Sequence, residues 1–388
     1  MENTSRLYDT LVETFGQLPM WRDRRHLYTL AWMLVGWLSA AEAGLCAWIP
    51  YVKSRAQMAQ SVQRRFRRWL ANARIDVDAL YAPLIQAALA EWGEAKLYLA
   101  LDTTLLWDQV CLVRVSVIYR GRAVPVVWKT LGYSSNAVAF EEYAPLLRQT
   151  ARLLPVHCPV TLLADRAFAD VRLLTLLDTE LHWHWRLRLK HHITVRRKGF
   201  YRRRLSSVLP PPGHACFWHN VAVFEEGYGP VHLAMARAPQ AKDEWIVLSD
   251  TPTSLATFAE YGLRFDIEEN FLDDKSNGFQ LQASQLRDPQ AVHRLAFVLA
   301  LATLFLVVQG VAVVVAGQRR RIDPHWQRGY SYLHIGWHYV HHALAHGWTL
   351  VTQLVLSPTP DPSPAYASKR KGKPHIPAFV VETCVFRI

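Results

Sequence analysis

Four side chains of the segment 261–275 have the types and spacing needed to act together on a phosphate group. On an ideal helix, which turns about 100° per residue, Tyr261, Arg264, Glu268 and Lys275 fall within an arc of roughly 60°. A carboxylate on such a face can ligate a metal ion, while the flanking guanidinium and ammonium groups can bind phosphates. The same spacing could instead give an i,i+4 salt bridge on a surface helix, and taken alone this simpler interpretation is favoured. The other acids of the segment point roughly 80° or more away from the arc: Asp266, Glu269, Asp273 and Asp274.

Two aspartates could complete a metal site with Glu268, because each of them follows an expected strand. The apolar run 97–101 leads into Asp102, and the short run 160–164 ends at Asp165. Two aspartates at the ends of neighbouring strands and a glutamate on a later helix can converge on one point. Such hard oxygen ligands suit Mg²⁺ or Mn²⁺, which keep substrate phosphate oxygens as further ligands. Two ions about 3.5–4 Å apart would bind both the attacking and the leaving oxygen of a phosphoryl transfer.

The same residues resemble a known signature. The run Tyr261-x2-Arg264-x3-Glu268-x6-Lys275 matches the Y-R-E-K signature of the insertion-sequence-4 family of bacterial transposases, which belong to the DDE group with a ribonuclease-H-like core. Residues 101–104 look like the first aspartate motif of that family, and residues 164–168 look like its second. Residues 275–279 and 284–288 resemble the continuation after the signature. The resemblance covers roughly residues 54–310.

The resemblance implies a DNA transposase that cuts transposon ends and transfers the 3′-hydroxyl into target DNA. Its catalytic and metal-binding residues would be Asp102, Asp165 and Glu268, with two Mg²⁺ ions that Mn²⁺ can replace. Double-stranded DNA, as transposon ends and target, is the implied partner, and a homodimer is expected in the DNA complex. Whether a hairpin intermediate forms rests on the resemblance alone.

The resemblance also implies contacts to DNA. The side chains of Tyr261, Arg264 and Lys275 would contact phosphates at the transposon end. Trp245 resembles a tryptophan that stacks on a flipped base in some relatives, although a buried core aromatic is an equally good interpretation. The sequence departs from several relatives at Phe265, where they carry a tryptophan, which weakens inferences about base handling and leaves the metal site untouched.

Three regions are expected to position these residues in an α/β fold. Residues 1–92 form a helical DNA-binding region, residues 93–310 a ribonuclease-H-like catalytic core, and residues 311–388 a helical C-terminal part with a basic tail. Within the core, the order strand, strand, strand, helix, strand is followed by a β-rich basic insertion at about 181–250 and by a long helix from Ser254 to about Leu272.

Two basic segments are candidates for DNA binding. The first follows Ser54, a plausible N-cap, and its helix would enter a DNA groove or present a solvated basic face; the resemblance favours the groove. Its arginines are Arg64, Arg65, Arg67 and Arg68. The second segment mixes basic and aromatic residues without an acid between Leu181 and Phe224, which suits a nucleic-acid track better than a solvated face. Its candidates are Arg196, Arg197 and Lys198, and Arg186 and Arg188 belong to the same basic run.

Composition narrows the class of protein further. The chain has 388 residues and a net charge of +12 with only 20% charged residues, which indicates a packed protein whose basic surfaces bind a polyanion, either DNA or an anionic membrane. The five cysteines are scattered and form no CxxC pair, and the N-terminus lacks a signal peptide, so a cytoplasmic location is expected. Residues 295–317 are uncharged and long enough to span a membrane, but their place after the signature favours a buried core helix and no membrane partner.

Three alternatives stay open from the sequence. The chain could be a magnesium-dependent nuclease without strand transfer, a non-catalytic DNA-binding protein derived from a transposase, or a membrane protein.

Overall fold

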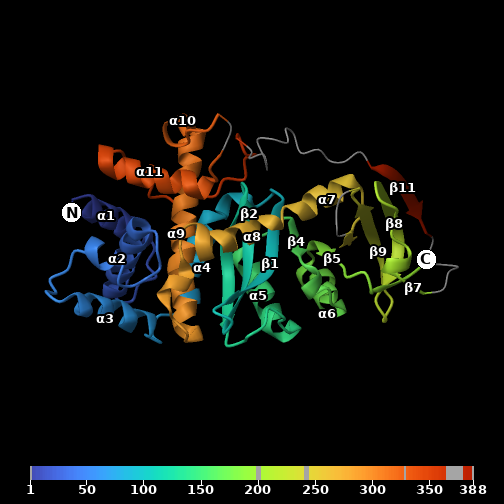
Figure 1. Ribbon diagram of the computed structural model, residues 1–388, viewed down its shortest axis with the longest axis horizontal. Helices are drawn as coiled ribbons and strands as arrows, with labels where there is room; N and C mark the ends of the chain where they lie inside the picture. The colour runs from blue at the N-terminus through green and yellow to red at the C-terminus, as the bar shows by residue number, and fades with distance from the viewer. Residues whose placement is uncertain (1, 198–201, 240–243, 327–328, 364–378, 387–388) are drawn as a thin grey trace.

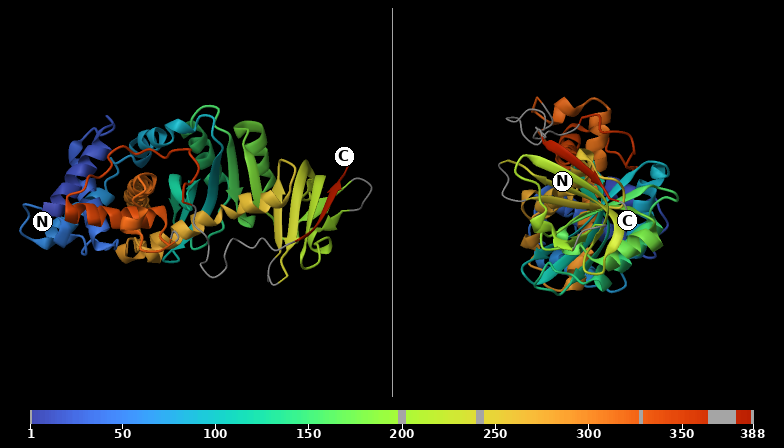
Figure 2. Two further views of the ribbon diagram at one scale, coloured as in Figure 1. Left: turned by 90° about the horizontal axis from the view of Figure 1, so that it is seen from above. Right: turned by 90° about the vertical axis from the view of Figure 1, so that its right-hand side faces the viewer.

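The computed structural model describes all residues except 1, 198–201, 240–243, 327–328, 364–378 and 387–388. The molecule is elongated, with N-terminal helices at one end and the last strand at the other (Figure 1). One continuous sheet runs through most of its length, and helices lie on both of its faces (Figure 2). The chain is therefore an α/β protein, as predicted.

The catalytic core predicted from the sequence occupies one half of this sheet. Its strands follow the order β3-β2-β1-β4-β5. Strands β1, β4 and β5 are parallel, whereas β2 and β3 form an antiparallel meander on β1. This is the strand order of a ribonuclease-H-like core, so the predicted fold class is confirmed. The strand bounds are β1 (Leu97–Leu106), β2 (Val110–Tyr119), β3 (Arg122–Leu131), β4 (Val160–Ala164) and β5 (His184–Arg188).

The β-rich insertion continues the same sheet. Strand β10 pairs antiparallel with β5, and the order then runs β9-β8-β6-β7. Strand β5 itself falls inside the segment 181–250 of the predicted insertion, although it pairs in parallel with β4 of the core. The bounds are β6 (Thr194–Arg196), β7 (Arg203–Arg204), β8 (His214–Val223), β9 (Tyr228–Arg237) and β10 (Trp245–Ser249).

The C-terminal part is not wholly helical as expected. Strand β11 (Val380–Val385) pairs in parallel with β8 at the far end of the sheet. Its sequence is rich in β-branched residues, which favour the pleated conformation. The helices of this part are α10 (Arg319–Ile322) and α11 (Tyr332–His346).

Helix α9 (Pro289–Val315) lies between the N-terminal helices and the sheet (Figure 1). It is the one helix of the described residues long and apolar enough to cross a membrane, but 89% of its most apolar window is buried inside the protein. It packs on β3 and on α2, α3, α4 and α11. Its contact with α11 is so close that a Cβ atom at Gly336 would lie 1.8 Å from the carbonyl oxygen of Leu306. The predicted buried core helix is therefore observed.

The remaining helices cover the N-terminal region and the core. Four helices of the first region confirm its helical prediction, and two further helices pack beside the sheet. They are α1 (Glu2–Gly16), α2 (Arg24–Ala40), α3 (Ala59–Leu70), α4 (Val77–Ala88), α5 (Phe140–Leu153) and α6 (Val171–Thr175), which continues as the π-helical turn η4 (Leu176–Leu181). Short 3-10 turns η1, η2, η3, η5 and η7 connect other elements: Ile49–Tyr51, Ala90–Trp92, Arg166–Phe168, Leu205–Ser207 and Leu281–Ser284.

The helix expected from Ser254 to Leu272 is divided in two. Ser254 caps it as predicted, by accepting a hydrogen bond from the backbone of Ala256, but α7 (Leu255–Gly262) ends before Arg264 and α8 (Phe265–Leu272) begins after it. At the junction the amide of Arg264 bonds the carbonyl of Tyr261, three residues back, as in a 3-10 turn. A π-helical turn, η6 (Asp273–Asn277), follows. The ideal-helix geometry assumed from the sequence therefore does not hold across the signature.

Candidate active site

The three predicted acids line one cleft. Asp102, Asp165 and Glu268 border a cavity of about 380 Å³ together with Arg264 and Lys275. The remaining lining residues are Thr103, Thr104, Phe271 and Leu272. Elements far apart in the chain thus bring the side chains singled out from the sequence to one place.

Strand register explains why the two aspartates meet. Leu101 of β1 pairs with Ala164 of β4, so the next residues, Asp102 and Asp165, leave the paired region side by side. Strand β4 ends there, whereas β1 continues to Leu106, paired only with β2. The sequence placed Asp102 at the end of its strand. In the structure it lies inside β1, where β1 loses its neighbour β4, and the cleft opens beside it.

The surroundings of Asp102 in the cleft disfavour its charged form. Burial raises the pKa of Asp102 to about 6; the Arg264 guanidinium and the Thr103 amide act against this rise, and the carboxylates of Asp165 and Glu268 add to it. The Thr103 amide donates to Asp102 Oδ1 at 2.8 Å. The carboxylates of Asp165 and Glu268 therefore each lie close enough to repel that of Asp102.

Arg264 lies between two of these carboxylates. Its Nη1 donates to Asp102 Oδ2 at 2.9 Å, and its Nη2 donates to Glu268 Oε1. Only 3% of the Arg264 side chain is exposed, against 48% for Glu268. The i,i+4 salt bridge considered from the sequence is therefore present, although in a buried cleft and with a third partner.

Tyr261 and Lys275 occupy different positions around the cleft. Tyr261 is fully buried beside Arg264, and burial raises the pKa of its hydroxyl to about 12. Lys275 lines the cleft and is half-buried; burial lowers its pKa, and Asp274 and Asp108 act against this. Lys275 is therefore the most accessible of these three side chains, whereas Tyr261 and Arg264 are buried.

The side chains of the cleft are of the types that bind a divalent metal ion, but they are not arranged around one point. The three carboxylates that line the cleft are hard oxygen donors, which Mg²⁺ and Mn²⁺ prefer. Among the described residues, however, no three acidic, histidine or cysteine side chains stand close enough to hold an ion together. The Arg264 guanidinium already bonds an oxygen of Asp102 and of Glu268, so a metal ion would require it to move.

Buried ion pairs hold α8 and η6 against the sheet. Arg114 of β2 donates to Asp274 Oδ2 at 2.8 Å and to Asn270 Oδ1 at 2.7 Å, and Arg122 of β3 donates to Asp273 Oδ2 at 2.7 Å. Asp273 and Asp274 bind these arginines of the sheet and are not among the residues that line the cleft. The pairs were missed from the sequence, where an arginine inside the otherwise apolar run of β2 was the available signal.

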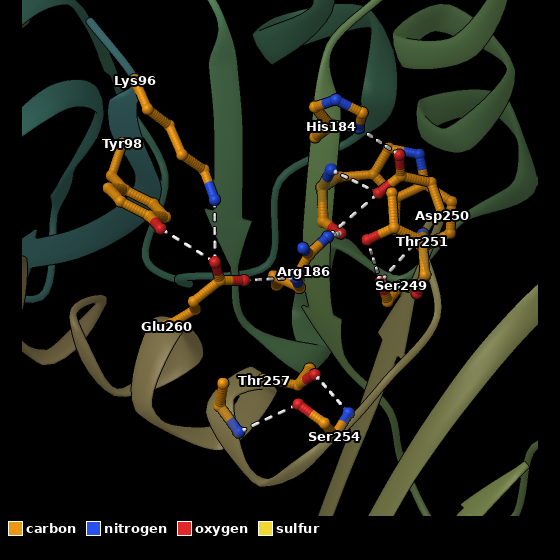
Figure 3. A network of polar contacts seen from close by, with 12 residues as sticks. Lys96, Tyr98, His184, Arg186, Ser249, Asp250, Thr251, Ser254, Thr257 and Glu260 are labelled. Carbon is orange, nitrogen blue, oxygen red and sulfur yellow. Dashed lines mark hydrogen bonds and ion pairs between the residues drawn. The ribbon is translucent and has the colours of Figure 1, made fainter.

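A second polar network anchors α7 beside the site (Figure 3). Glu260, which precedes Tyr261, accepts from Lys96 at 2.7 Å and from Arg186 at 2.9 Å. Arg186 also donates to Asp250 Oδ1 at 3.0 Å, and His184 contacts Asp250 as well. The network joins the start of β1 with β5, β10 and α7. Arg186 therefore has two acidic partners and is buried, which corrects its place in the predicted nucleic-acid track.

The basic helix predicted after Ser54 begins later than expected. Helix α3 starts at Ala59, and the Ser54 hydroxyl accepts from the Ala56 amide in a turn, so Ser54 is not the N-cap. Arg64, Arg67 and Arg68 are exposed on one face of α3. The side chain of Arg65 is instead partly buried beside Phe66, and burial lowers its pKa.

The candidates of the second basic segment are divided. Arg196 is exposed at the end of β6, while the guanidinium of Arg197 stacks 4.9 Å from the ring centroid of Trp218. Lys198 lies outside the described residues. Trp245 is partly buried and packs on Phe258, Tyr261 and Phe265 with ring centroids 5.8 to 6.1 Å apart. Trp245 thus occupies an aromatic cluster behind Arg264.

Comparisons with known proteins add a family to this geometry. A solved structure described as "Cryo-EM structure of piggyBac transposase synaptic complex with hairpin DNA (SNHP)" is similar with a TM-score of 0.48 and 11% identity, over 88% of this chain and 78% of that one. No curated protein matches the sequence. Residues 110–305, slightly more than half of the chain, match the family described as the transposase DDE domain. The match includes Asp165 and Glu268 and begins after Asp102. This protein belongs to the transposase DDE domain family.

Proposed function

We propose that this protein is a DNA transposase that cuts DNA at transposon ends and joins the 3′-hydroxyl to target DNA. Asp102, Asp165 and Glu268 would bind the divalent metal ions that this reaction needs. The observation that supports the proposal most is the register between β1 and β4, which places two aspartates beside a glutamate of α8 in one cleft. The family match supports the same class of reaction. The narrower Y-R-E-K branch rests on the signature residues alone.

Two Mg²⁺ ions, replaceable by Mn²⁺, would activate the attacking oxygen and stabilise the leaving oxygen when bound. Asp102, Asp165 and Glu268 would hold them through carboxylate oxygens. The ammonium group of Lys275, which lines the same cleft, would attract a phosphate of the DNA strand. The Thr103 amide holds Asp102 in place, and the Thr103 hydroxyl donates a hydrogen bond to the carbonyl oxygen of Asn136 at 3.0 Å.

The remaining parts of the proposal concern the DNA. The exposed basic face of α3, with Arg64, Arg67 and Arg68, would bind the phosphate backbone of the transposon ends, with Arg196 as a second contact. Two copies would act together on two ends, in the cytoplasm. Residues 1–92 would bind the transposon ends and residues 93–310 would carry out catalysis. Residues 311–388 would form the C-terminal part that packs on the other two.

A strand-transfer assay tests this proposal. Duplexes carrying the inverted repeats that flank the coding region are mixed with a supercoiled target plasmid, Mg²⁺ and the purified protein. We expect joined products from the wild type, and none from Asp102→Asn or Glu268→Gln. Glu269→Gln is the matched control, because Glu269 is the exposed neighbour of Glu268 and lies outside the cleft.

The same assay separates the alternatives. Cleavage without joined products would indicate a nuclease and refute strand transfer. End binding without any metal-dependent cleavage would indicate a non-catalytic DNA-binding protein. Full activity in both Asp102→Asn and Glu268→Gln would show that the chemistry takes place elsewhere.

A further inference from the structure

The cation that the structure places between two of the candidate metal ligands is a side chain of the protein itself. The two terminal nitrogens of Arg264 donate hydrogen bonds to Asp102 and Glu268, and only 3% of its side chain is exposed. Burial acts to lower the pKa of Arg264, but Tyr261, Asp102 and Glu268 raise it, so the guanidinium stays charged. It neutralises charge at the place where a metal ion would do so.

The Arg264 guanidinium occupies one oxygen atom of each of two candidate metal ligands. These atoms are Asp102 Oδ2 and Glu268 Oε1. A carboxylate oxygen that accepts a short charge-assisted hydrogen bond cannot also offer that lone pair to a metal at coordination distance. A metal ion that bound through these two oxygen atoms would therefore compete with the Arg264 bridge.

The backbone at Arg264 departs from regular α-helix geometry. Arg264 lies in the junction between α7 and α8, where i→i+3 bonds replace the regular helical bonds. A stretch of 3-10 geometry inside a helix often marks a hinge. Gly262, at the end of α7, has open space at the position that a Cβ atom would take.

We infer that Arg264 is an internal counter-ion that closes the free site, and that a divalent metal ion displaces it toward a DNA phosphate in the cleft. This rests on the proposed function, because it takes Asp102 and Glu268 to be metal ligands. A guanidinium fork matches a phosphate as well as it matches two carboxylates. Among the described residues, the Arg264 Nε has no hydrogen-bond partner, so one donor of the fork is already free. Metal and DNA then favour each other's binding, since the metal frees Arg264 and the phosphate receives it.

Mn²⁺ binding without DNA tests the inference. Free Mn²⁺ is measured by electron paramagnetic resonance during titration of the full-length wild type, Arg264→Gln, Arg264→Lys and the control Arg148→Gln. Arg148 forms its ion pair with Glu180 on the surface, away from the cleft. We expect Arg264→Gln to bind Mn²⁺ more tightly than the wild type by about 5- to 150-fold, the usual range for coupled sites. Arg264→Lys should lie between them, and Arg148→Gln should equal the wild type.

A second readout follows the side chain itself. Phenylglyoxal modifies accessible arginines, and mass spectrometry of the peptide that contains Arg264 gives its rate of modification. In the wild type this rate should rise several-fold when Mn²⁺ is added, whereas Arg114, buried against Asp274, should stay protected in both conditions. This measurement does not depend on whether a variant folds.

The outcomes separate the inference from the proposed function. Equal or weaker Mn²⁺ binding by Arg264→Gln, together with binding that Asp102→Asn abolishes, would overturn the counter-ion role and leave the metal site in place. Mn²⁺ binding that is the same in Arg264→Gln and in Arg264→Gln/Asp102→Asn would show instead that the metal site itself is wrong. Tighter binding by Arg264→Gln that the added Asp102→Asn abolishes supports both.

Discussion

Replacing Arg114 by methionine tests whether buried ion pairs hold the helix that carries Glu268. The side chains of Arg114 and Asp274 are each only 2% exposed, and their N–O distance is 2.8 Å. The variant leaves the Asp274 carboxylate and the Asn270 amide without their cationic partner inside the protein. Removing one partner of a buried pair costs about 3–5 kcal/mol, because the remaining charge is uncompensated. That is a large part of a usual unfolding free energy of about 5–15 kcal/mol.

A surface pair of similar length provides the control. Arg148 and Glu180 lie 2.6 Å apart, but their side chains are 41% and 47% exposed, so Arg148→Met should cost only about 0–1 kcal/mol. Both variants are compared with the wild type by urea unfolding at pH 7, followed by far-ultraviolet circular dichroism. Arg114→Met/Asp274→Leu, which removes both charges, should recover at least half of the loss. Equal costs for the two single variants would refute the reasoning, which attributes the larger cost of Arg114→Met to the burial of the pair.

Three further predictions concern other parts of the molecule. Gly336→Ala should destabilise the contact of α11 with α9 by about 1–3 kcal/mol or more in urea unfolding, because its Cβ would lie 1.8 Å from Leu306 O, while Gly93→Ala, which meets no atom, should change little. Replacing Arg64, Arg67 and Arg68 together by glutamine should weaken binding of the transposon-end duplex and lower the slope of log K against log salt by about 2–3, as three phosphate contacts require; an unchanged slope would exclude α3 from the interface. Because the pKa of Asp102 is raised to about 6, its contribution to stability is fully present below about pH 4 and is lost as the pH rises past 6. In metal-free buffer, the free energy of unfolding of the wild type relative to Asp102→Asn should therefore fall between these two pH values. A rise over the same range would contradict the raised pKa.

Local sequence signals located parts of the candidate site where a short apolar run or a helix cap lay next to the residue concerned. The aspartates could be placed because each follows a short apolar run, and neighbouring parallel strands bring such positions together. Ser254 could be identified as an N-cap because its hydroxyl acts on a backbone amide two residues away. The length and apolar composition of α9 predicted a helix, and only its neighbours decide between a core and a membrane.

Features that depend on distant partners could not be predicted in this way. The acids that bind Arg186 lie 64 and 74 residues further along the chain, so a window around Arg186 showed only basic residues and suggested a nucleic-acid track. The break at Arg264 was missed because helical projection assumes a constant rotation per residue and takes no account of distant partners such as Asp102, which Arg264 contacts. Strand β11 depends on pairing with β8: Val380 pairs with His214, which lies more than 150 residues before it, and only folding brings the two segments together.

The distribution of paired charges bears on how DNA could reach the cleft. Arg114 pairs with Asp274, and Arg186 and Lys96 together face Asp250 and Glu260, so these clusters contain equal numbers of both signs and leave the net charge of +12 to the rest of the molecule. The cleft itself holds three carboxylates against the two cations Arg264 and Lys275. Under the proposed function, DNA would be attracted by exposed basic surfaces such as that of α3 and repelled by the carboxylates in the cleft until further cations arrive. A metal ion that displaced Arg264 would change both the attraction and the repulsion, because it would add positive charge to the carboxylates and release a guanidinium for the phosphate. The order in which metal and DNA bind would then matter less than the requirement that both be present.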